Sequence, residues 1–293
     1  MAVSITSESF PGRLVGAKSR TTFYLEAGPV DGQAVVFIHG FGGTARNFTL
    51  NMGPLGAAGF RVIVPELWGM GRSAKPRGRY SLDRWVDQLV DLLDQLGIQQ
   101  TAVVGHSMGG AVAVRLARRH PERVTKLLLV APLGFGARRN IRFIRLAVLP
   151  GVAPVLLRFR RFRVPTREEM IQRAQRRFGG RISQEGALAW AESAVLMFQE
   201  RGFVQGLVRT GRACIQLIEG RDHRVRKDYA ELTLPTLVIW GDEDRTVPTQ
   251  DSQTLRQLRT DARLEMYTQC GHHPYLEATE RFNQMAQAFL QEA

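Results

Sequence analysis

The apolar positions of the chain alternate between short continuous runs and longer amphipathic segments. The continuous runs are typical of strands that are covered on both faces, and they occupy residues 34–38, 60–64, 101–104, 124–131 and 235–240. Residues 13–27 predict one or two further strands, and 262–267 another, and a final amphipathic helix is expected from about Glu277 to Leu290. The clearest amphipathic helix follows Ser81, a suitable N-cap, and ends before Gly97. Strands alternating with helices predict an α/β fold, with a mostly parallel sheet covered by helices on both faces.

The pattern changes between Gly134 and Tyr229. This stretch shows no buried strand, is helical in its periodicity, and is interrupted by proline and glycine. It is therefore predicted to be a helical insertion, 134–229, in a core domain formed by 1–133 and 230–293. A sheet of this kind binds its ligands beyond the C-terminal ends of its strands, so the glycine-bearing loops after the strands are expected to converge there.

The positive charge of the chain is concentrated in the predicted insertion. The net charge is +13, and 19 arginines and one lysine against eight acidic residues between Gly134 and Asp228 account for nearly all of it. The basic stretch lacks interleaved aromatic residues, so no nucleic-acid partner is expected. Solvated surface is the commonest explanation for such charge, and peripheral contact with an anionic membrane is the second.

Other compositional features restrict the class of protein. The two cysteines, Cys214 and Cys270, show no disulfide or metal-ligand pattern, so free thiols and no metal are expected. The first thirty residues carry charges and no apolar core of a signal peptide, and no run reaches the roughly 18 apolar residues of a membrane span. A soluble, cytoplasmic protein is the resulting expectation, and its oligomeric state is left open.

A candidate nucleophile lies in the stretch Gly105-His106-Ser107-Met108-Gly109. Gly-x-Ser-x-Gly between a strand and a helix is the pattern of a nucleophile elbow, a sharp turn that exposes a serine at the sheet edge. The turn strains the serine backbone, and a Cβ two residues away on either side would collide with neighbouring elements. The strand before Ser107 and the small-residue helix after it supply the context that the motif requires.

A serine needs a neighbouring base that is itself oriented by a third group. The best-placed histidines follow the last strand, in Gly271-His272-His273-Pro274; Gly271 frees His272, whereas Pro274 restricts His273. His39 and His106 lie inside glycine motifs and are interpreted as packing residues. The strand at 235–240 ends in three acids, Asp242, Glu243 and Asp244, which charge alone does not separate.

These motifs together resemble the α/β-hydrolases, in the capped, esterase-like branch. The resemblance covers essentially the whole chain outside the insertion, through the following pieces: His39-Gly40-Phe41-Gly42, Gly69-Met70-Gly71-Arg72-Ser73, the elbow, Gly241-Asp242-Glu243-Asp244 with Val247-Pro248, and Gly271-His272-His273-Pro274 followed by Glu277. It implies a triad of Ser107, Asp244 and His272, and it makes the insertion a cap.

The resemblance also implies an oxyanion hole formed by the backbone N–H groups of Phe41 and Met108. With Gly40, these two residues are expected to line the substrate pocket. Two departures from the family pattern stand out: Glu66 replaces the usual Asp before the second glycine loop, and the first loop lacks the Pro found in carbon–carbon bond hydrolases. The second departure makes a carbon–carbon bond hydrolase the less favoured reading.

The favoured function is therefore a cofactor-independent carboxylic ester hydrolase that acts on a small, hydrophobic acyl substrate through an acyl-enzyme. One alternative is hydrolysis of a carbon–carbon bond in a diketone-type acid, with cap arginines holding the carboxylate. The other is a non-enzymatic binding module recruited to anionic membranes by the cap. Residues 141–149 and 152–162 combine apolar residues with arginines, as an interfacial helix does, but packing of a cap helix on the core is the preferred explanation.

Overall fold

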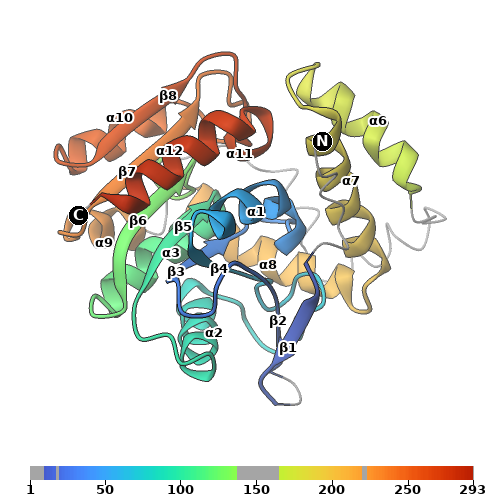
Figure 1. The fold of residues 1–293 in the computed structure, drawn as a ribbon, viewed down its shortest axis with the longest axis horizontal. Coiled ribbons are helices and arrows are strands. Elements are labelled where there is room, and N and C mark those ends of the chain that lie inside the picture. Colours follow the sequence, from blue (N-terminus) through green and yellow to red (C-terminus); the bar gives the residue numbers. More distant parts are fainter. Residues whose placement is uncertain (1–9, 18–19, 137–164, 220–222, 293) are drawn as a thin grey trace.

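The computed structural model describes residues 10–17, 20–136, 165–219 and 223–292, and this part of the chain contains an eight-stranded sheet (Figure 1). The strands are β1 (Gly12–Val15), β2 (Thr22–Ala27), β3 (Gln33–Ile38), β4 (Phe60–Pro65), β5 (Thr101–His106), β6 (Val124–Val130), β7 (Thr236–Gly241) and β8 (Arg263–Tyr267). Their order is β1-β2-β4-β3-β5-β6-β7-β8. Only β1 and β2 run antiparallel to their neighbours, so the predicted mostly parallel sheet is confirmed.

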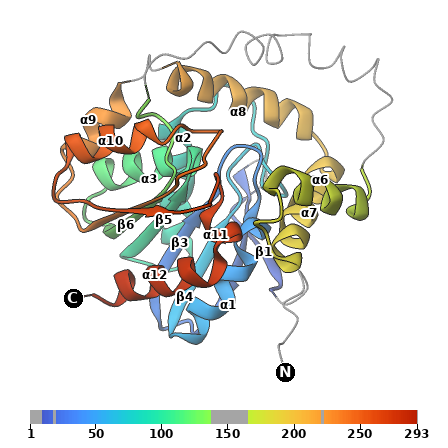
Figure 2. The same cartoon turned by 90° about the horizontal axis from the view of Figure 1, so that it is seen from above.

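Helices cover both faces of this sheet (Figure 2). The helices of the described core residues are η3 (Ala45–Phe48), α1 (Thr49–Ala57), α2 (Leu82–Gln95), α3 (Met108–Arg119), α9 (Arg224–Ala230), α10 (Gln250–Leu258), α11 (Pro274–Glu277) and α12 (Thr279–Gln291). Successive residues of β3 face opposite sides: Val36 and Ile38 pack with α2 and α3, whereas Val35 and Phe37 pack with α1 and α12. The continuous apolar runs are explained by this double covering.

The helix after Ser81 shows why the sequence signals its ends clearly. The Ser81 hydroxyl accepts the backbone N–H of Arg84 at 3.2 Å, and Trp85, Leu89 and Leu92 are buried against the sheet. Beyond the last turn, Gly97 adopts φ +67°, a left-handed conformation that glycine reaches without steric cost. The predicted cap residues and the predicted packing face of α2 are confirmed.

The described part of the insertion is helical, as predicted. Within the insertion, the described residues 165–219 form α6 (Arg167–Phe178), α7 (Gln184–Gln199) and α8 (Phe203–Ile218). Helix α9 already packs on the core, because its Val225 and Tyr229 join the same apolar cluster as α3. The domain boundaries at 134 and 229 stay predictions, and the predicted interfacial segments 141–149 and 152–162 lie outside the described residues.

Two local differences from the sequence analysis have physical causes. The final helix, expected from Glu277 to Leu290, is two helices that are broken at Ala278 (φ −136°). Helix α1 was not predicted, because Gly53, Pro54 and Gly56 weaken its helical signal. Gly56 is needed there for close packing, since a Cβ at this position would lie 2.9 Å from the backbone nitrogen of Gly28.

The loops at the C-terminal ends of the parallel strands meet at one edge of the sheet. A Cβ at Gly109 would lie 2.2 Å from the carbonyl oxygen of Ile38, so the start of α3 packs directly on the end of β3. A Cβ at Gly241 would lie 2.2 Å from the carbonyl oxygen of Gly271, which brings the loops after β7 and β8 together. The expected convergence of the glycine-bearing loops is therefore observed. In the described part of the chain, no helix is long and apolar enough to cross a bilayer.

Candidate active site

Ser107 occupies the turn between β5 and α3, with φ 54° and ψ −116°. This positive φ is strained for a residue that has a Cβ. Gly105 and Gly109 make the turn possible, because a Cβ on Gly105 would lie 2.6 Å from the Gly109 carbonyl oxygen. The structure thus confirms the predicted reason for both glycines, and the strand-turn-helix context of the elbow.

The backbone of Ser107 is anchored to the neighbouring strand β6. Its N–H donates to the Val130 carbonyl oxygen at 2.9 Å, and its carbonyl oxygen accepts the N–H of Leu133 at 2.9 Å. The first glycine loop passes close by, since a Cβ at Gly40 would lie 3.1 Å from the Ser107 Cβ. Only a residue without a side chain fits between the loop and the elbow at this position.

An imidazole and a carboxylate from two other loops meet nearby. His272 Nδ1 lies 2.7 Å from Asp244 Oδ2, and both side chains are buried. The other oxygen, Asp244 Oδ1, accepts the N–H groups of Thr246 at 2.7 Å and Val247 at 2.9 Å. The carboxylate is therefore fixed in direction by three hydrogen bonds.

This geometry sets the tautomer of His272. Because the Asp244 carboxylate only accepts hydrogen bonds, Nδ1 of His272 carries the proton and Nε2 has a free lone pair. A neutral imidazole oriented in this way acts as a general base. Of the three adjacent acids, Asp242 and Glu243 are exposed, and only Asp244 is buried against the imidazole.

The loop that carries His272 is tied to the elbow through His106. His106 Nε2 donates to the backbone carbonyl oxygen of His272 at 2.9 Å, and the two rings lie with their centroids 4.6 Å apart. The structure thus brings Asp244 and His272 into contact and places both beside the residue that precedes Ser107. The direct hydrogen bond between Ser107 Oγ and His272 Nε2 stays a prediction.

The other buried histidines of this region have packing roles. His39 Nδ1 donates to the Gly40 carbonyl oxygen at 2.8 Å, and Nε2 accepts the N–H of Leu67 at 3.0 Å, which joins the first and second glycine loops. Burial lowers the pKa of His39 to about 4. Burial also lowers the pKa values of His106 and His273 well below 6.5, so all three imidazoles are neutral at pH 7.

The proposed oxyanion donors lie on either side of the elbow. Met108 is the first residue of α3, so its N–H has no acceptor within the helix and points out of the positive end of the helix dipole. The Met108 side chain is fully buried in the core, whereas the Phe41 side chain is 47% exposed. The oxyanion hole and the pocket of Gly40, Phe41 and Met108 stay predictions.

Glu66 has a role that the sequence did not reveal. Its carboxylate accepts the N–H of Ala45 at 3.3 Å and the N–H of Arg72 at 2.5 Å, and thereby ties the first glycine loop to the second. A Cβ at Gly71 would lie 2.0 Å from Glu66 Oε2, so the longer side chain fills the space under the second loop. Desolvation in this buried position raises the pKa of Glu66 to about 7, although both backbone donors oppose the rise.

The insertion reaches the same region through α7. Ser193 Oγ lies 2.8 Å from Thr44 Oγ1 and donates to Asn47 Oδ1 at 2.9 Å, all three side chains being buried. Thr44 caps η3 directly after the first glycine loop. This buried polar network therefore connects the inserted helices to the loop that carries Phe41. No cluster that could hold a metal ion occurs among the residues that the structure describes.

Comparisons with known proteins agree with this geometry. A family model described as the alpha/beta hydrolase fold matches residues 33–279. The chain is 34% identical over 279 residues to a 2-hydroxymuconate semialdehyde hydrolase of Pseudomonas putida. This alignment covers 90% of this chain and 89% of that protein. The chain is 31% identical over 277 residues to a 2-hydroxy-6-oxo-6-phenylhexa-2,4-dienoate hydrolase of Comamonas testosteroni, with 92% and 91% covered.

A solved structure gives the same result in three dimensions. It is a serine-to-alanine variant of a meta-cleavage product hydrolase from Pseudomonas fluorescens IP01, complexed with acetates. The TM-score is 0.73 at 27% identity, and the alignment covers 95% of this chain and 97% of that one. The named relatives are carbon–carbon bond hydrolases, so they favour the alternative reading of the sequence over the carboxylic ester hydrolase.

Proposed function

Because the chain belongs to the α/β-hydrolase fold family, we propose that it is a serine hydrolase that cleaves a carbon–carbon bond beside a ketone in a conjugated, diketone-type acid. One observation carries the choice of bond: the 34% identity, over 90% of the chain, to a 2-hydroxymuconate semialdehyde hydrolase. The serine route is supported by the strained turn at Ser107 and by the 2.7 Å contact between His272 and Asp244.

In the proposed first step, Ser107 Oγ attacks the ketone carbon while His272 Nε2 takes the hydroxyl proton. Asp244 holds the imidazole in the required tautomer and stabilises the imidazolium that forms. The backbone N–H groups of Phe41 and Met108 are the proposed donors to the oxyanion. A donor of this kind contributes about 3 kcal/mol to lowering the barrier.

Cleavage of the carbon–carbon bond requires a place for the bonding electron pair. When the tetrahedral adduct collapses, the pair moves into the conjugated carbonyl system of the leaving fragment, and His272 returns the proton to that fragment. An ester bond then joins the acyl group to Ser107. Water, deprotonated by His272, attacks this ester, and the carboxylic acid leaves as the serine is regenerated. The balance is one water consumed for each bond broken.

Carboxylic ester hydrolysis is the second candidate, because it uses the same three side chains and the same acyl-enzyme. The specific observation in its favour is Phe41, whose half-exposed ring follows directly on Gly40 beside the nucleophile. The buried apolar cluster of Met70, Met197 and Phe203 joins the second glycine loop to α7 and α8. The half-exposed aromatic ring of Phe41 suits a hydrophobic acyl group.

The two candidates are separated by comparing two substrates with the same enzyme preparation. The loss of visible absorbance follows the cleavage of 2-hydroxy-6-oxo-6-phenylhexa-2,4-dienoate. We expect its kcat/KM to be at least about 100-fold above that of p-nitrophenyl butyrate, because polar contacts to the substrate carboxylate are expected to discriminate between the two. Ser107→Ala, with a melting temperature near that of the wild type, is the matched control. The reverse preference would select ester hydrolysis.

A third measurement tests the serine chemistry that both candidates share. We expect a fluorophosphonate probe to label the wild-type protein at Ser107 and to leave Ser107→Ala unlabelled. Turnover of either substrate that persists in Ser107→Ala would overturn the proposal. A folded wild-type protein that neither reacts with the probe nor turns over either substrate would overturn it as well.

A further inference from the structure

Glu277 fixes the backbone of the loop that carries His272. Its carboxylate accepts the N–H of Gly271 at 2.9 Å and the N–H of His273 at 2.9 Å, one on each side of His272. The Glu277 side chain is only 1% exposed. A buried carboxylate with two backbone donors locks both peptide groups in place, so the direction of the imidazole depends on where Glu277 lies.

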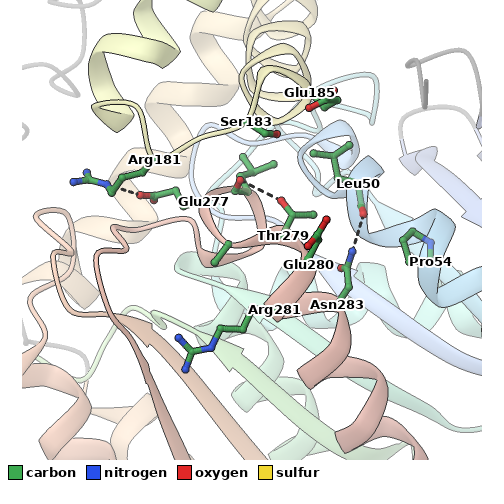
Figure 3. A pocket seen from close by; sticks show the side chains of 12 residues that line it. Leu50, Pro54, Arg181, Ser183, Glu185, Glu277, Thr279, Glu280, Arg281 and Asn283 are labelled. Carbon is green, nitrogen blue, oxygen red and sulfur yellow. Dashed lines mark hydrogen bonds and ion pairs between the residues drawn. The ribbon is translucent and has the colours of Figure 1, made fainter. Parts of the chain in front are cut away.

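Arg181, from the turn between α6 and α7 of the insertion, holds this carboxylate. Its Nε lies 3.2 Å from Glu277 Oε2 (Figure 3). Its Nη1 lies 2.5 Å from Glu243 Oε2. Glu243 precedes Asp244 in the acid loop, and its N–H donates to the Cys270 carbonyl oxygen at 2.8 Å. One side chain of the insertion thus bridges the loops of both Asp244 and His272.

The same turn touches the base loop through uncharged contacts. The Phe178 ring packs edge-on against His273, with centroids 5.3 Å apart and an interplanar angle of 89°. A Cβ at Gly186, in the first turn of α7, would lie 3.2 Å from the Leu276 carbonyl oxygen. These contacts hold the turn between α6 and α7 against the His272 loop independently of Arg181. Removal of the guanidinium is therefore expected to remove a charge and two ion pairs while leaving this packing in place.

We propose that Arg181 is a positioning residue for His272, and that its ion bridge to Glu277 and Glu243 sets the direction of the imidazole from the inserted segment. The inference rests on the proposed function, in which His272 is the base. Arg181 acts through Glu277 and the loop backbone and does not itself touch a reacting atom.

The Arg181 guanidinium is the cation that Glu277 and Glu243 share, so its loss leaves these two carboxylates without their common partner on the loops that hold His272 and Asp244. The charged and titratable groups around His272 come from every element packed against it: Asp244 and Glu243 from the acid loop, His106 from the elbow, His273 and Glu277 from its own loop and α11, and Arg177 and Arg181 from the insertion.

The experiment compares Arg181→Gln and Arg181→Lys with the wild-type protein, and Arg167→Gln is the matched control. Arg167 also lies in the insertion, and it pairs with Glu192 at 2.8 Å across α6 and α7, so the same charge is removed away from the base loop. Two readouts are recorded: the titration of the His272 imidazole by NMR, which needs no turnover, and the pH profiles of kcat and KM with the better substrate.

We expect Arg181→Gln to change the NMR titration curve of the His272 imidazole and to lower kcat about tenfold with little change in KM. Arg181→Lys should restore the titration, because it retains the charge. Arg167→Gln should leave both readouts within experimental error of the wild type. If Arg181→Gln titrates and turns over like the wild type, the inference is overturned.

Failure of the inference and failure of the proposed function give different results. A wild-type protein without hydrolase activity, in which Arg181→Gln still shifts the His272 titration, refutes the proposed function and retains the electrostatic coupling. An active wild-type protein whose His272 titration is the same in all variants refutes the coupling alone. Equal losses of kcat in Arg181→Gln and Arg181→Lys, without a shift in titration, refute it too, because they indicate packing rather than charge.

Discussion

Replacement of Glu66 by Gln tests whether a buried carboxylate under the second glycine loop makes stability depend on pH. In the folded protein the pKa of Glu66 is raised from 4.5 to about 7, chiefly by desolvation. A group whose folded-state pKa is raised contributes stability that is present below its unfolded pKa and is lost as the pH rises through its folded pKa. The wild-type protein should therefore lose this contribution between pH 4.5 and pH 7.

The size of the effect follows from the shift. A rise of about 2.5 units, at about 1.4 kcal/mol for each unit, corresponds to a loss of about 3 kcal/mol in the free energy of unfolding across that interval. The amide introduced by Glu66→Gln does not titrate, so the free energy of unfolding of this variant should not fall in this way between pH 4.5 and pH 7. It also places an amide NH₂ group opposite a backbone N–H donor, either Ala45 or Arg72, which costs about 1–3 kcal/mol at every pH.

The assay is urea unfolding followed by tryptophan fluorescence at several pH values between 5 and 8.5. We expect the variant to be the less stable protein at pH 5 and to gain relative to the wild type as the pH rises, with most of the change complete by pH 8. Glu168→Gln, at an exposed position of α6, is the control and should run parallel to the wild type. Parallel curves for Glu66→Gln and the wild type would refute the reasoning.

Three further predictions concern the same edge of the sheet. The pKa of His39 is lowered to about 4, so the stability that its neutral imidazole contributes is present above pH 6.5 and is lost as the pH falls through 4. Because His39→Gln lacks this pH dependence, it should lower the pH midpoint of acid unfolding followed by fluorescence. An unchanged midpoint would contradict this. Ser107→Gly relieves the positive φ of 54° and should be about 1 kcal/mol more stable than Ser107→Ala in calorimetry. Gly109→Ala drives a Cβ to 2.2 Å from the Ile38 carbonyl oxygen and should cost more than about 3 kcal/mol, so a melting temperature near that of the wild type would argue against the elbow geometry.

The sequence predicted those features whose signals are local. The apolar runs identify buried strands because both faces of the sheet are covered, and the glycine spacing identifies the elbow because only that turn needs it. The contact of His272 with Asp244 was anticipated through the family resemblance, since the residues alone left Asp242, Glu243 and Asp244 equivalent. The structure separates them by burial: Asp244 is 7% exposed, and the other two lie at the surface.

The features that the sequence did not predict depend on contacts between distant segments. Arg181 and Glu277 lie 96 positions apart in the sequence. Glu66 contacts Ala45 between two loops, and loops have no hydrophobic periodicity from which the contact could be predicted. Helix α1 was missed because its glycines and its proline lower helical propensity, and Gly56 is required by close packing against Gly28 rather than by local structure. The sequence favoured ester hydrolysis because the first loop lacks a Pro, whereas the named relatives favour the carbon–carbon bond alternative.

The chain order of the sheet has a consequence during synthesis on the ribosome. The strands on both sides of Ser107 are complete long before the loop that carries His272 exists, because His106 and His272 are 166 positions apart. At about 5–20 residues per second, that separation corresponds to roughly 10–30 s of translation. His272 is therefore the last member of the proposed triad to be synthesised, and because domains fold as units, the site can assemble only after the loop that carries this histidine has emerged.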